Sequence, residues 1–346
     1  MFDLHMPEPT TGLMPRDVVL TGDRPTGPLH LGHLAGSLAA RVAGQDICPH
    51  TILVADLQAL TDHAQDVARV RDSVDEVMLD YAAVGLDPGK VRFCLQSEVP
   101  ELAEITVLLL NLTSLERILR NPTVKAEAGQ KGDRARNAGF AVYPASQAAD
   151  ILGFAATAVP VGRDQAPMLE LASHLADQLA LRGRSLPVPR PVFPEGGSGR
   201  LPGVDGRKAS KTLGNAIALG ASDADIAAAV RRMVSDASRT SPSDPGDPEK
   251  PIAFAYLRAF DVDRSGLAEL EAEYRRGGVR DGDVKARAEK VVRELVGPIR
   301  DRRGAGPGDR AALRDVLRDG TAAARLDAVR ALDEIRACFG LARRAA

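Results

Sequence analysis

The sequence is poor in aromatic residues and cysteines. Aromatic side chains make up 3% of the 346 residues and tryptophan is absent, so leucine, valine, isoleucine and alanine must form most of the core. The three cysteines, Cys48, Cys94 and Cys338, lack the paired spacing of a zinc site or a disulfide framework. We therefore expect buried thiols in a reducing cytoplasm and no bound metal ion.

Long hydrophobic runs and an excess of one charge are also missing. The longest apolar runs, such as Ile105 to Leu110, are too short to span a bilayer. Residues 1–16 lack the apolar core behind a basic end that marks a secretory signal. The formal net charge is −2, so bulk charge gives no attraction to nucleic acid. These absences predict a cytoplasmic protein without membrane or DNA partners, in which any RNA contact comes from local patches.

The most informative segment is residues 21–36, which is rich in glycine and carries two histidines. It follows a short apolar run and opens a stretch with helical periodicity, so it falls at a strand-to-helix turn. Helix N-termini attract phosphate, and glycines let a nucleotide approach the backbone. Taken alone, the pattern also fits a turn with incidental histidines. The positions concerned are Gly22, Gly27, Gly32, His30 and His33.

A second segment with possible phosphate chemistry spans residues 206–215. Lys208 and Lys211 lie three residues apart among glycines, serine and threonine, so both lysines can reach one polyphosphate. A short lysine and serine run is more often a solvated loop. The order of the two segments therefore carries more information than either one.

The two segments in this order resemble class I aminoacyl-tRNA synthetases. His30 to His33 corresponds to the HIGH motif of that family, and Lys208 to Thr212 corresponds to its KMSKS loop. Three further blocks are similar to the tryptophanyl/tyrosyl branch, and within it to the tryptophanyl-tRNA synthetases: Gln96 to Glu101, Tyr143 to Leu152, and Val159 to Gln165. The resemblance covers most of the chain to about residue 220 and the rest more loosely.

The alternation of elements predicts an α/β fold. Apolar runs at 18–21, 51–55 and 91–95 are typical of buried parallel strands, and a helical pattern separates the last two. We expect a doubly wound, Rossmann-like parallel sheet over residues 1–220, with a helix over 101–119 followed by a polar stretch at 121–139. The resemblance implies that a helical insertion at about 101–140 helps to form a homodimer.

The second half of the chain predicts helices only. Residues 183–207 are rich in proline and glycine and are expected to form a mobile approach to the lysine loop. Beyond it, Ser222 and Asp225 fit a helix start, and further helices are expected at 252–260, 264–275, 282–302, 308–318 and 321–343. We therefore expect an all-helical domain over 221–346, and the resemblance implies that it recognises the anticodon.

The resemblance implies a complete reaction. L-Tryptophan would attack the α-phosphorus of ATP, bound with Mg²⁺, and give tryptophanyl-adenylate and pyrophosphate. The tryptophanyl group would then pass to the 3′-terminal ribose of tRNA(Trp). Four residues would take catalytic roles by contacting the phosphates, namely His30, His33, Lys208 and Lys211.

The resemblance also implies two sets of binding residues. In the amino-acid set, a buried carboxylate at Asp150 would accept the indole N–H and reject substrates without a donor. The ATP set is Gly22, Arg24, Pro25, Thr26, Gly32, His33, Lys125, Gly162, Arg163, Asp164, Leu201, Lys208, Ala209, Ser210, Lys211 and Thr212. The tryptophan set is Tyr143, Gln147, Asp150, Val159, Val161 and Gln165.

Departures from the family pattern leave alternatives open. The lysine loop has Ala209 where the family has methionine, Arg24 stands where glutamine is common, and Gln147 is typical of tyrosyl enzymes. A tyrosyl-tRNA synthetase is therefore one alternative. A paralogue that binds tryptophan or nucleotide outside translation is another. A small-molecule nucleotidylyltransferase also uses His-x-Gly-His, but it would have little use for the helical part after the lysine loop.

Overall fold

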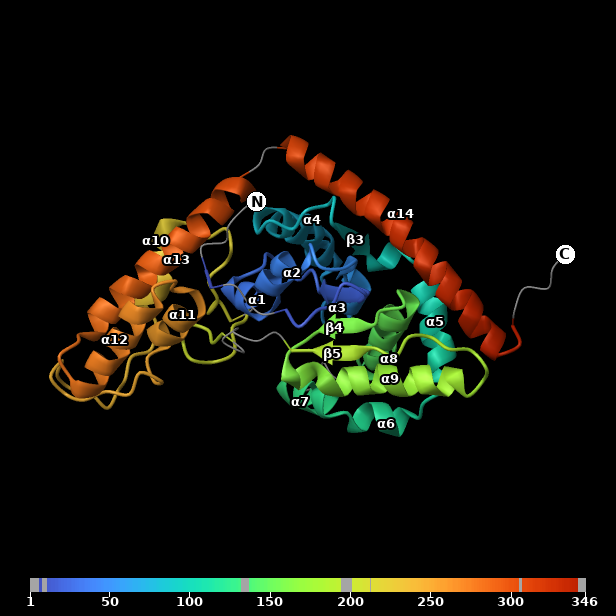
Figure 1. Cartoon of the computed structure of the whole chain (residues 1–346), viewed down its shortest axis with the longest axis horizontal. Coiled ribbons are helices and arrows are strands. Elements are labelled where there is room, and N and C mark those ends of the chain that lie inside the picture. The colour runs from blue at the N-terminus through green and yellow to red at the C-terminus, as the bar shows by residue number, and fades with distance from the viewer. Residues whose placement is uncertain are drawn as a thin grey trace.

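The computed structural model describes residues 6–7, 11–131, 137–193, 201–211, 213–304 and 307–341. One part of the molecule is a parallel sheet with helices on its faces, and helices form the other part, from α10 (Asp223–Arg231) through α11 (Ile252–Phe260) and α12 (Arg264–Arg276) to α13 (Asp281–Arg303) (Figure 1). The last helix, α14 (Pro307–Cys338), runs back across the first part beside β3 (Val91–Leu95) and α5 (Glu101–Leu110) (Figure 1). No helix of the described ranges is both long and apolar enough to cross a membrane.

Within the described residues, five strands form one parallel sheet in the order β3-β2-β1-β4-β5. The doubly wound α/β fold predicted from the sequence is confirmed, and its topological switch point lies between β1 and β4. The strands are β1 (Val19–Asp23), β2 (His50–Val54), β3 (Val91–Leu95), β4 (Ala158–Pro160) and β5 (Arg190–Val192).

Strand β5 corrects one expectation, because it lies inside the stretch 183–207 that the sequence predicted to be mobile. Pro191 occupies its middle position and cannot donate to a neighbouring strand. The strand is at the edge of the sheet, where a proline is tolerated, and it pairs on one side with β4.

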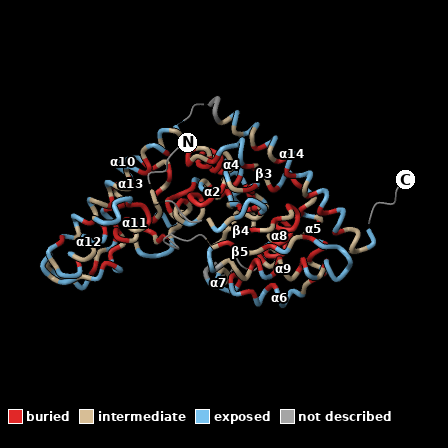
Figure 2. The backbone as a smooth tube through the Cα atoms, viewed as in Figure 1, coloured by how far each residue is buried: buried red, intermediate tan, exposed pale blue. Residues whose placement is uncertain are grey.

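Successive side chains of β2 point to opposite faces of the sheet and pack in two different hydrophobic cores. Ile52 packs among residues of α1, η1 and α4, whereas Leu53 packs among residues of α5, α8 and α9. Figure 2 shows the buried residues concentrated along the sheet and the inner sides of the helices. The helices are α1 (Leu31–His33), the π-helical η1 (Leu34–Leu38), α2 (Ala39–Gly44), α4 (Val67–Ala83), α5 (Glu101–Leu110), α8 (Ala138–Gly153) and α9 (Ala166–Ala180).

The insertion after β3 contains more helices than the sequence predicted. The single helix expected over 101–119 is two helices, α5 and α6 (Leu115–Arg120), because Ser114 caps a new start by accepting a hydrogen bond from the N–H of Arg117 at 3.2 Å. Helix α7 (Pro122–Lys131) lies within the polar stretch 121–139. Shorter elements complete this part: α3 (Asp56–His63), η2 (Gln96–Glu98) and η4 (Arg163–Gln165).

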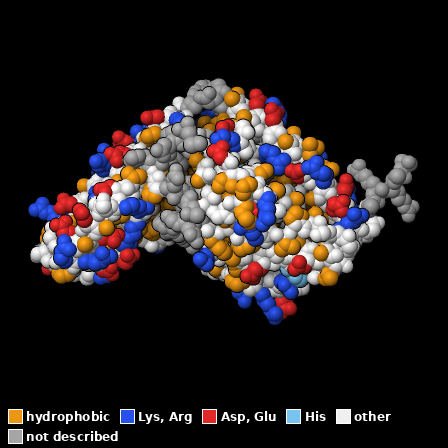
Figure 3. Space-filling view, viewed as in Figure 1, with side chains coloured by type: hydrophobic (Ala, Val, Ile, Leu, Met, Phe, Trp, Pro, Cys, Tyr) orange, Lys and Arg blue, Asp and Glu red, His pale blue; other side chains and the backbone are white. Residues whose placement is uncertain are grey.

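The helices after the lysine loop lie close to the predicted positions. Helix α10 (Asp223–Arg231) begins with the capping box formed by Ser222 and Asp225. It is followed by α11 (Ile252–Phe260), α12 (Arg264–Arg276) and α13 (Asp281–Arg303). Figure 3 shows basic and acidic side chains intermingled over the viewed face of these helices and of α14, rather than gathered by sign.

Helix α14 (Pro307–Cys338) corrects the prediction of separate helices at 308–318 and 321–343. The helix continues through Gly320 without a break. A Cβ at this position would lie 2.3 Å from the carbonyl oxygen of Phe93. The glycine therefore lets the helix approach the sheet and does not end it. Next to it, the hydroxyl of Thr321 accepts a hydrogen bond from the N–H of Leu95 at 2.9 Å. Helix α14 thus covers the edge strand β3, which would otherwise expose unpaired backbone groups.

Candidate active site

A cleft of about 460 Å³ opens at the carboxyl ends of β1 and β4, where a doubly wound sheet binds its ligands. Its walls come from β1, η1, α3, α7, α8, the segment after β4 and Lys208 of the lysine loop. A larger groove of about 850 Å³ lies between α4 and α14, but none of the predicted site residues lines it. The position at the switch point therefore identifies the smaller cleft as the candidate active site.

Most of the predicted site residues are close to this cleft. The predicted residues that line it are Gly22, Arg24, Thr26, His33, Gly162 and Lys208 from the ATP set, with Tyr143, Gln147, Asp150, Val159, Val161 and Gln165 from the tryptophan set. The others with described side chains, Pro25, His30, Gly32, Lys125, Arg163, Leu201, Ala209, Ser210 and Lys211, are not among its lining residues. Thr212 and the side chain of Asp164 lie outside the described part of the chain.

The two histidines sit at the N-terminus of α1 and contact each other, with ring centroids 3.9 Å apart. The Nδ1 atom of His30 accepts a hydrogen bond from the N–H of Gly32 at 3.1 Å, and Nδ1 of His33 accepts one from the N–H of His30 at 3.2 Å. Each neutral ring must therefore carry its proton on Nε2, which remains a donor.

Burial keeps both imidazoles neutral near pH 7. It lowers the pKa of His30 to about 3 and the pKa of His33 to about 4, and Lys211 adds to both shifts. The turn thus presents neutral N–H donors beside the N-terminal end of a helix. This combination suits phosphate oxygens without placing another fixed cation in the cleft.

A buried ion pair below the histidines was missed by the sequence analysis. The guanidinium of Arg41 lies 2.6 Å from the carboxylate of Asp23, which also accepts a hydrogen bond from the hydroxyl of Tyr81 at 2.7 Å. Burial raises the pKa of Asp23, but Arg41 and His33 outweigh burial and hold that pKa well below its usual range. Asp23 therefore stays ionised beside His33, and its position at the end of a buried strand was the available signal.

The lysine loop is held against the histidine turn. The ammonium group of Lys211 donates to the carbonyl oxygen of Gly27 at 2.6 Å. Backbone hydrogen bonds join the following segment to the turn, from Leu31 N–H to Ile217 at 2.9 Å and from Leu219 N–H to Leu29 at 3.0 Å. The two motifs, about 175 residues apart in sequence, therefore meet at one end of the cleft.

The charge of Lys211 is maintained in this position. Burial lowers its pKa to about 8, while the carboxylates of Asp23 and Asp80 oppose the shift. At pH 7 the ammonium form still dominates, and a bound anion would stabilise it further.

Arg24, a departure from the family pattern, is paired with Asp62 at 3.1 Å at the rim of the cleft.

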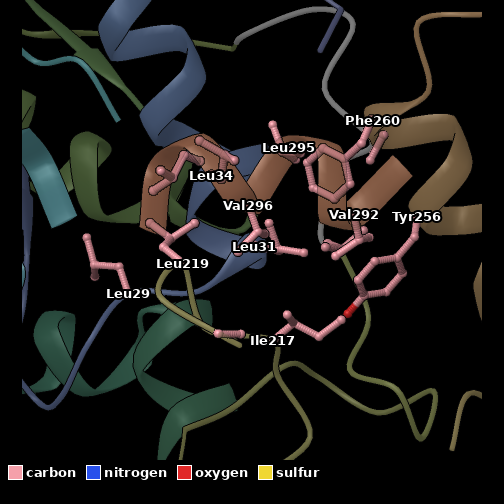
Figure 4. Close-up of a cluster of buried hydrophobic side chains, with 14 of the residues drawn as sticks. Leu29, Leu31, Leu34, Ile217, Leu219, Tyr256, Phe260, Val292, Leu295 and Val296 are labelled. Carbon is pink, nitrogen blue, oxygen red and sulfur yellow. The ribbon is translucent and has the colours of Figure 1, made fainter. Parts of the chain in front are cut away.

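The histidine turn is fixed from behind by an apolar cluster. Leu29, Leu31 and Leu34 pack with Ile217 and Leu219 from the segment after the lysine loop and with side chains of α11 and α13 (Figure 4). The residues from α11 and α13 labelled in the figure are Tyr256, Phe260, Val292, Leu295 and Val296. The C-terminal helices therefore share one core with the turn.

The opposite end of the cleft contains a buried carboxylate. Asp150, on α8, is 3% exposed, and burial raises its pKa to about 7 although a hydrogen bond from Gln96 lowers it. Gln58 from α3 also donates to it, at 3.0 Å. Glu127 from α7 lines the same cleft. Gln58 and Glu127 are single polar residues outside the short motifs, so no sequence signal pointed to them. Gln96 opens one of the blocks that resemble the family, but no role was predicted for it.

Two further features bear on ligands. Lys125 is exposed on α7, whereas Leu201 is buried. Among the described side chains, no group of three or more histidines, cysteines, aspartates or glutamates is arranged to hold a metal ion.

The fold and the cleft define a nucleotide-binding α/β protein with the paired histidine and lysine motifs of class I synthetases. The chain belongs to the family of class I tRNA synthetases (W and Y), whose model matches residues 16–297. That match spans the sheet, the cleft, the lysine loop and most of the C-terminal helices.

Three individual proteins show which members of this family the chain is similar to. The tryptophan–tRNA ligase of Clostridium longisporum is 44% identical over 335 residues, covering 95% of this chain and 98% of that protein. The tryptophan–tRNA ligase of Streptococcus agalactiae is 42% identical, covering 95% and 99%. The tryptophanyl-tRNA synthetase of Campylobacter jejuni, complexed with ADP and tryptophan, superposes with a TM-score of 0.80 at 29% identity, covering 93% of this chain and 99% of that chain.

Proposed function

We propose that this chain is a tryptophan–tRNA ligase. It activates L-tryptophan with ATP to tryptophanyl-adenylate and pyrophosphate, and then transfers the tryptophanyl group to the 3′-terminal ribose of tRNA(Trp). One observation carries the proposal: the histidine turn and the lysine loop meet at one end of a cleft whose other end holds a buried carboxylate. The names of relatives at 42–44% identity support it.

The ATP end of the reaction depends on positioning and charge. ATP enters as its Mg²⁺ complex, with its phosphates at the N-terminus of α1 and its backbone contacts at Gly22, Thr26 and Gly162. The imidazoles of His30 and His33 donate to phosphate and ribose oxygens. The ammonium groups of Lys208 and Lys211 take up the charge that develops on the departing pyrophosphate.

The amino-acid end selects the substrate and orients its carboxylate. The carboxylate of Asp150 accepts the indole N–H, and Val159 and Val161 form walls beside the ring. Tyr143, Gln147 and Gln165 provide polar groups for the α-ammonium and carboxylate. The substrate carboxylate is itself the nucleophile, so the protein needs to hold it in line with the α-phosphorus and does not form a covalent intermediate.

The wider organisation belongs to the same proposal. Residues 1–220 form the catalytic domain, with the insertion at about 101–140, and residues 221–346 read the anticodon. Val107, Leu115 and Leu119 on α5 and α6 expose apolar side chains that suit a homodimer contact.

Lys125 and Leu201 approach ATP when it binds. Charging tRNA for translation gives the protein a cytoplasmic location.

The decisive experiment is amino-acid-dependent exchange of labelled pyrophosphate into ATP. We expect exchange with tryptophan and not with tyrosine, together with charging of a tRNA(Trp) transcript. Asp150→Asn should raise the KM for tryptophan, and Lys211→Ala should lower kcat. Exchange with tyrosine alone would assign the chain to the tyrosyl enzymes. Exchange with neither amino acid would contradict the proposal and favour a binding protein outside translation.

A further inference from the structure

Two glutamines from different elements contact the carboxylate of Asp150. Gln96, directly after β3, places its Nε2 atom 2.9 Å from both carboxylate oxygens. Gln58, in α3, places its Nε2 atom 3.0 Å from Oδ2. Both donors are neutral amides, so they hold the carboxylate in place without cancelling its charge.

The orientation of the Gln96 amide is fixed by a backbone group. Its Oε1 atom lies 3.1 Å from the backbone N–H of Gln58, which can only donate. The amide oxygen must therefore face that N–H, and the amide nitrogen must face Asp150. Gln96 is 1% exposed, so turning its amide over would break these contacts without replacement by water.

The remaining acceptor capacity of Asp150 can then be counted. A carboxylate offers about four acceptor positions, two on each oxygen. The nitrogen of Gln96 is equally distant from Oδ1 and Oδ2 and so occupies the inner position of each. Gln58 donates to Oδ2 as well, at 3.0 Å, and so takes the second position of that oxygen. The outer position of Oδ1 remains, and Asp150 lines the cleft while Gln96 does not.

We infer that Gln58 and Gln96 are positioning residues for amino-acid selection, which leave Oδ1 of Asp150 as the acceptor for a single N–H donor on the substrate side chain. The inference rests on the proposed function and names the atom that reads the indole. An indole edge has one N–H donor and fills the remaining position. A ring without a donor leaves this buried oxygen without its partner.

The ionisation of Asp150 adds a pH dependence with a definite sign. Burial raises its pKa to about 7, and the amide of Gln96 opposes that shift. Burial also raises the pKa of the Cys94 thiol on β3, and the charge of Asp150 adds to that rise. Glu127 and Tyr143 line the cleft nearby. The ionised form accepts the indole N–H, so tryptophan binding weakens as the pH falls through about 7. Removing a donor to the charged form raises the pKa and moves this loss to higher pH.

The absence of tryptophan from the chain provides a direct binding assay. The protein contains four tyrosines and no tryptophan, so excitation at the red edge of indole absorption reports the tryptophan ligand without a contribution from the protein, and the anisotropy of its emission separates bound from free ligand. Binding can therefore be measured without catalysis. A tryptophan analogue with sulfur in place of the indole N–H, 3-benzothienylalanine, serves as the donor-free probe by competition.

The test variant is Gln58→Met, which keeps the length of the side chain and removes its donor. We expect the Kd for tryptophan to rise by about tenfold, its pH midpoint to move upward, and the KM for ATP to stay unchanged. The Kd for 3-benzothienylalanine should change by less than about twofold, because this probe does not use the acceptor. Gln45→Met is the matched control, since Gln45 hydrogen-bonds to Gly85 away from the cleft and should change neither ligand.

The outcomes separate the inference from the proposed function. Equal losses of affinity for tryptophan and the sulfur analogue, or an unchanged pH midpoint, would overturn the positioning role while leaving tryptophan activation in place. A wild-type protein that binds tryptophan without catalysing exchange would refute the proposed function, and the same titrations would still test Gln58. If the wild-type protein does not bind tryptophan, both are wrong.

Discussion

Removing Arg303 should destabilise the protein by breaking a buried ion pair that reaches the histidine turn. The guanidinium of Arg303, at the end of α13, lies 2.6 Å from Oδ1 of Asp80 and also pairs with Glu76. Asp80 on α4 is completely buried, and its Oδ2 atom accepts a hydrogen bond from the N–H of Leu29 at 2.6 Å. One carboxylate therefore joins α13, α4 and the residue before His30.

The size of the effect follows from the burial of the two partners. Breaking a buried ion pair by removing one partner costs about 3–5 kcal/mol, because the other charge is left uncompensated. The side chain of Arg303 is 18% exposed, so water can partly replace it, and we expect the lower end, about 3 kcal/mol for Arg303→Met. An unfolding entropy of about 2.1 cal/mol/K per residue over 346 residues converts this into a Tm lowered by about 4 °C.

Thermal unfolding followed by circular dichroism measures this loss. The matched control is Arg314→Met, because the pair of Arg314 with Asp75 is solvent-exposed and its removal should leave Tm unchanged. Adding Asp80→Asn to Arg303→Met removes the stranded charge and should recover part of the stability. If Arg303→Met and Arg314→Met have the same Tm, the pair of Arg303 with Asp80 does not stabilise the contact between α13 and α4, and the reasoning fails.

Three further substitutions test separate parts of the structure. Gly320→Ala should lower the free energy of unfolding in urea by about 1–3 kcal/mol, because the new Cβ meets the carbonyl oxygen of Phe93. Gly282→Ala should not lower it, because a Cβ at Gly282 has no neighbouring atom within 4 Å. Equal effects of the two substitutions would contradict the close approach at Gly320. Ala155→Gly should stabilise by up to about 1 kcal/mol, since φ of Ala155 is +51°, and a lower Tm would refute this. Lys211→Ala should slow pyrophosphate exchange by about a hundredfold with Tm unchanged, and a normal rate would remove it from the mechanism.

The parts of the fold that follow local patterns were predictable from the sequence. The first three strands are short apolar runs, and α10 starts at the capping box that Ser222 and Asp225 define. Two of the errors arise where a distant contact decides the local structure. Gly320 has the signature of a helix end, but its lack of a side chain serves the packing of α14 on β3. Pro191 argues against a strand until its place at the sheet edge is known.

The candidate site divides in the same way. The glycines, His30, His33 and the two lysines stand in short motifs whose spacing carries the chemistry. Asp23 and Arg41 are 18 residues apart and form a buried pair through the fold alone. Gln58 occupies a helix position that looks solvent-exposed in the sequence, and Asp150, 92 residues later, is what makes it functional. Single polar residues of this kind have no local pattern to identify them.

The placement of Asp80 implies that the histidine turn and the C-terminal helices are rigidly connected. Leu29 is bound through its N–H to Asp80 and through its carbonyl oxygen to Leu219, while Arg303 closes on the same carboxylate. A Cβ at Gly220 would lie 3.0 Å from the Arg303 side chain, so the segment after the lysine loop leaves just enough room for it. Displacing α13 would therefore strain this buried pair and the backbone of the histidine turn together, because tightly packed interiors transmit displacement.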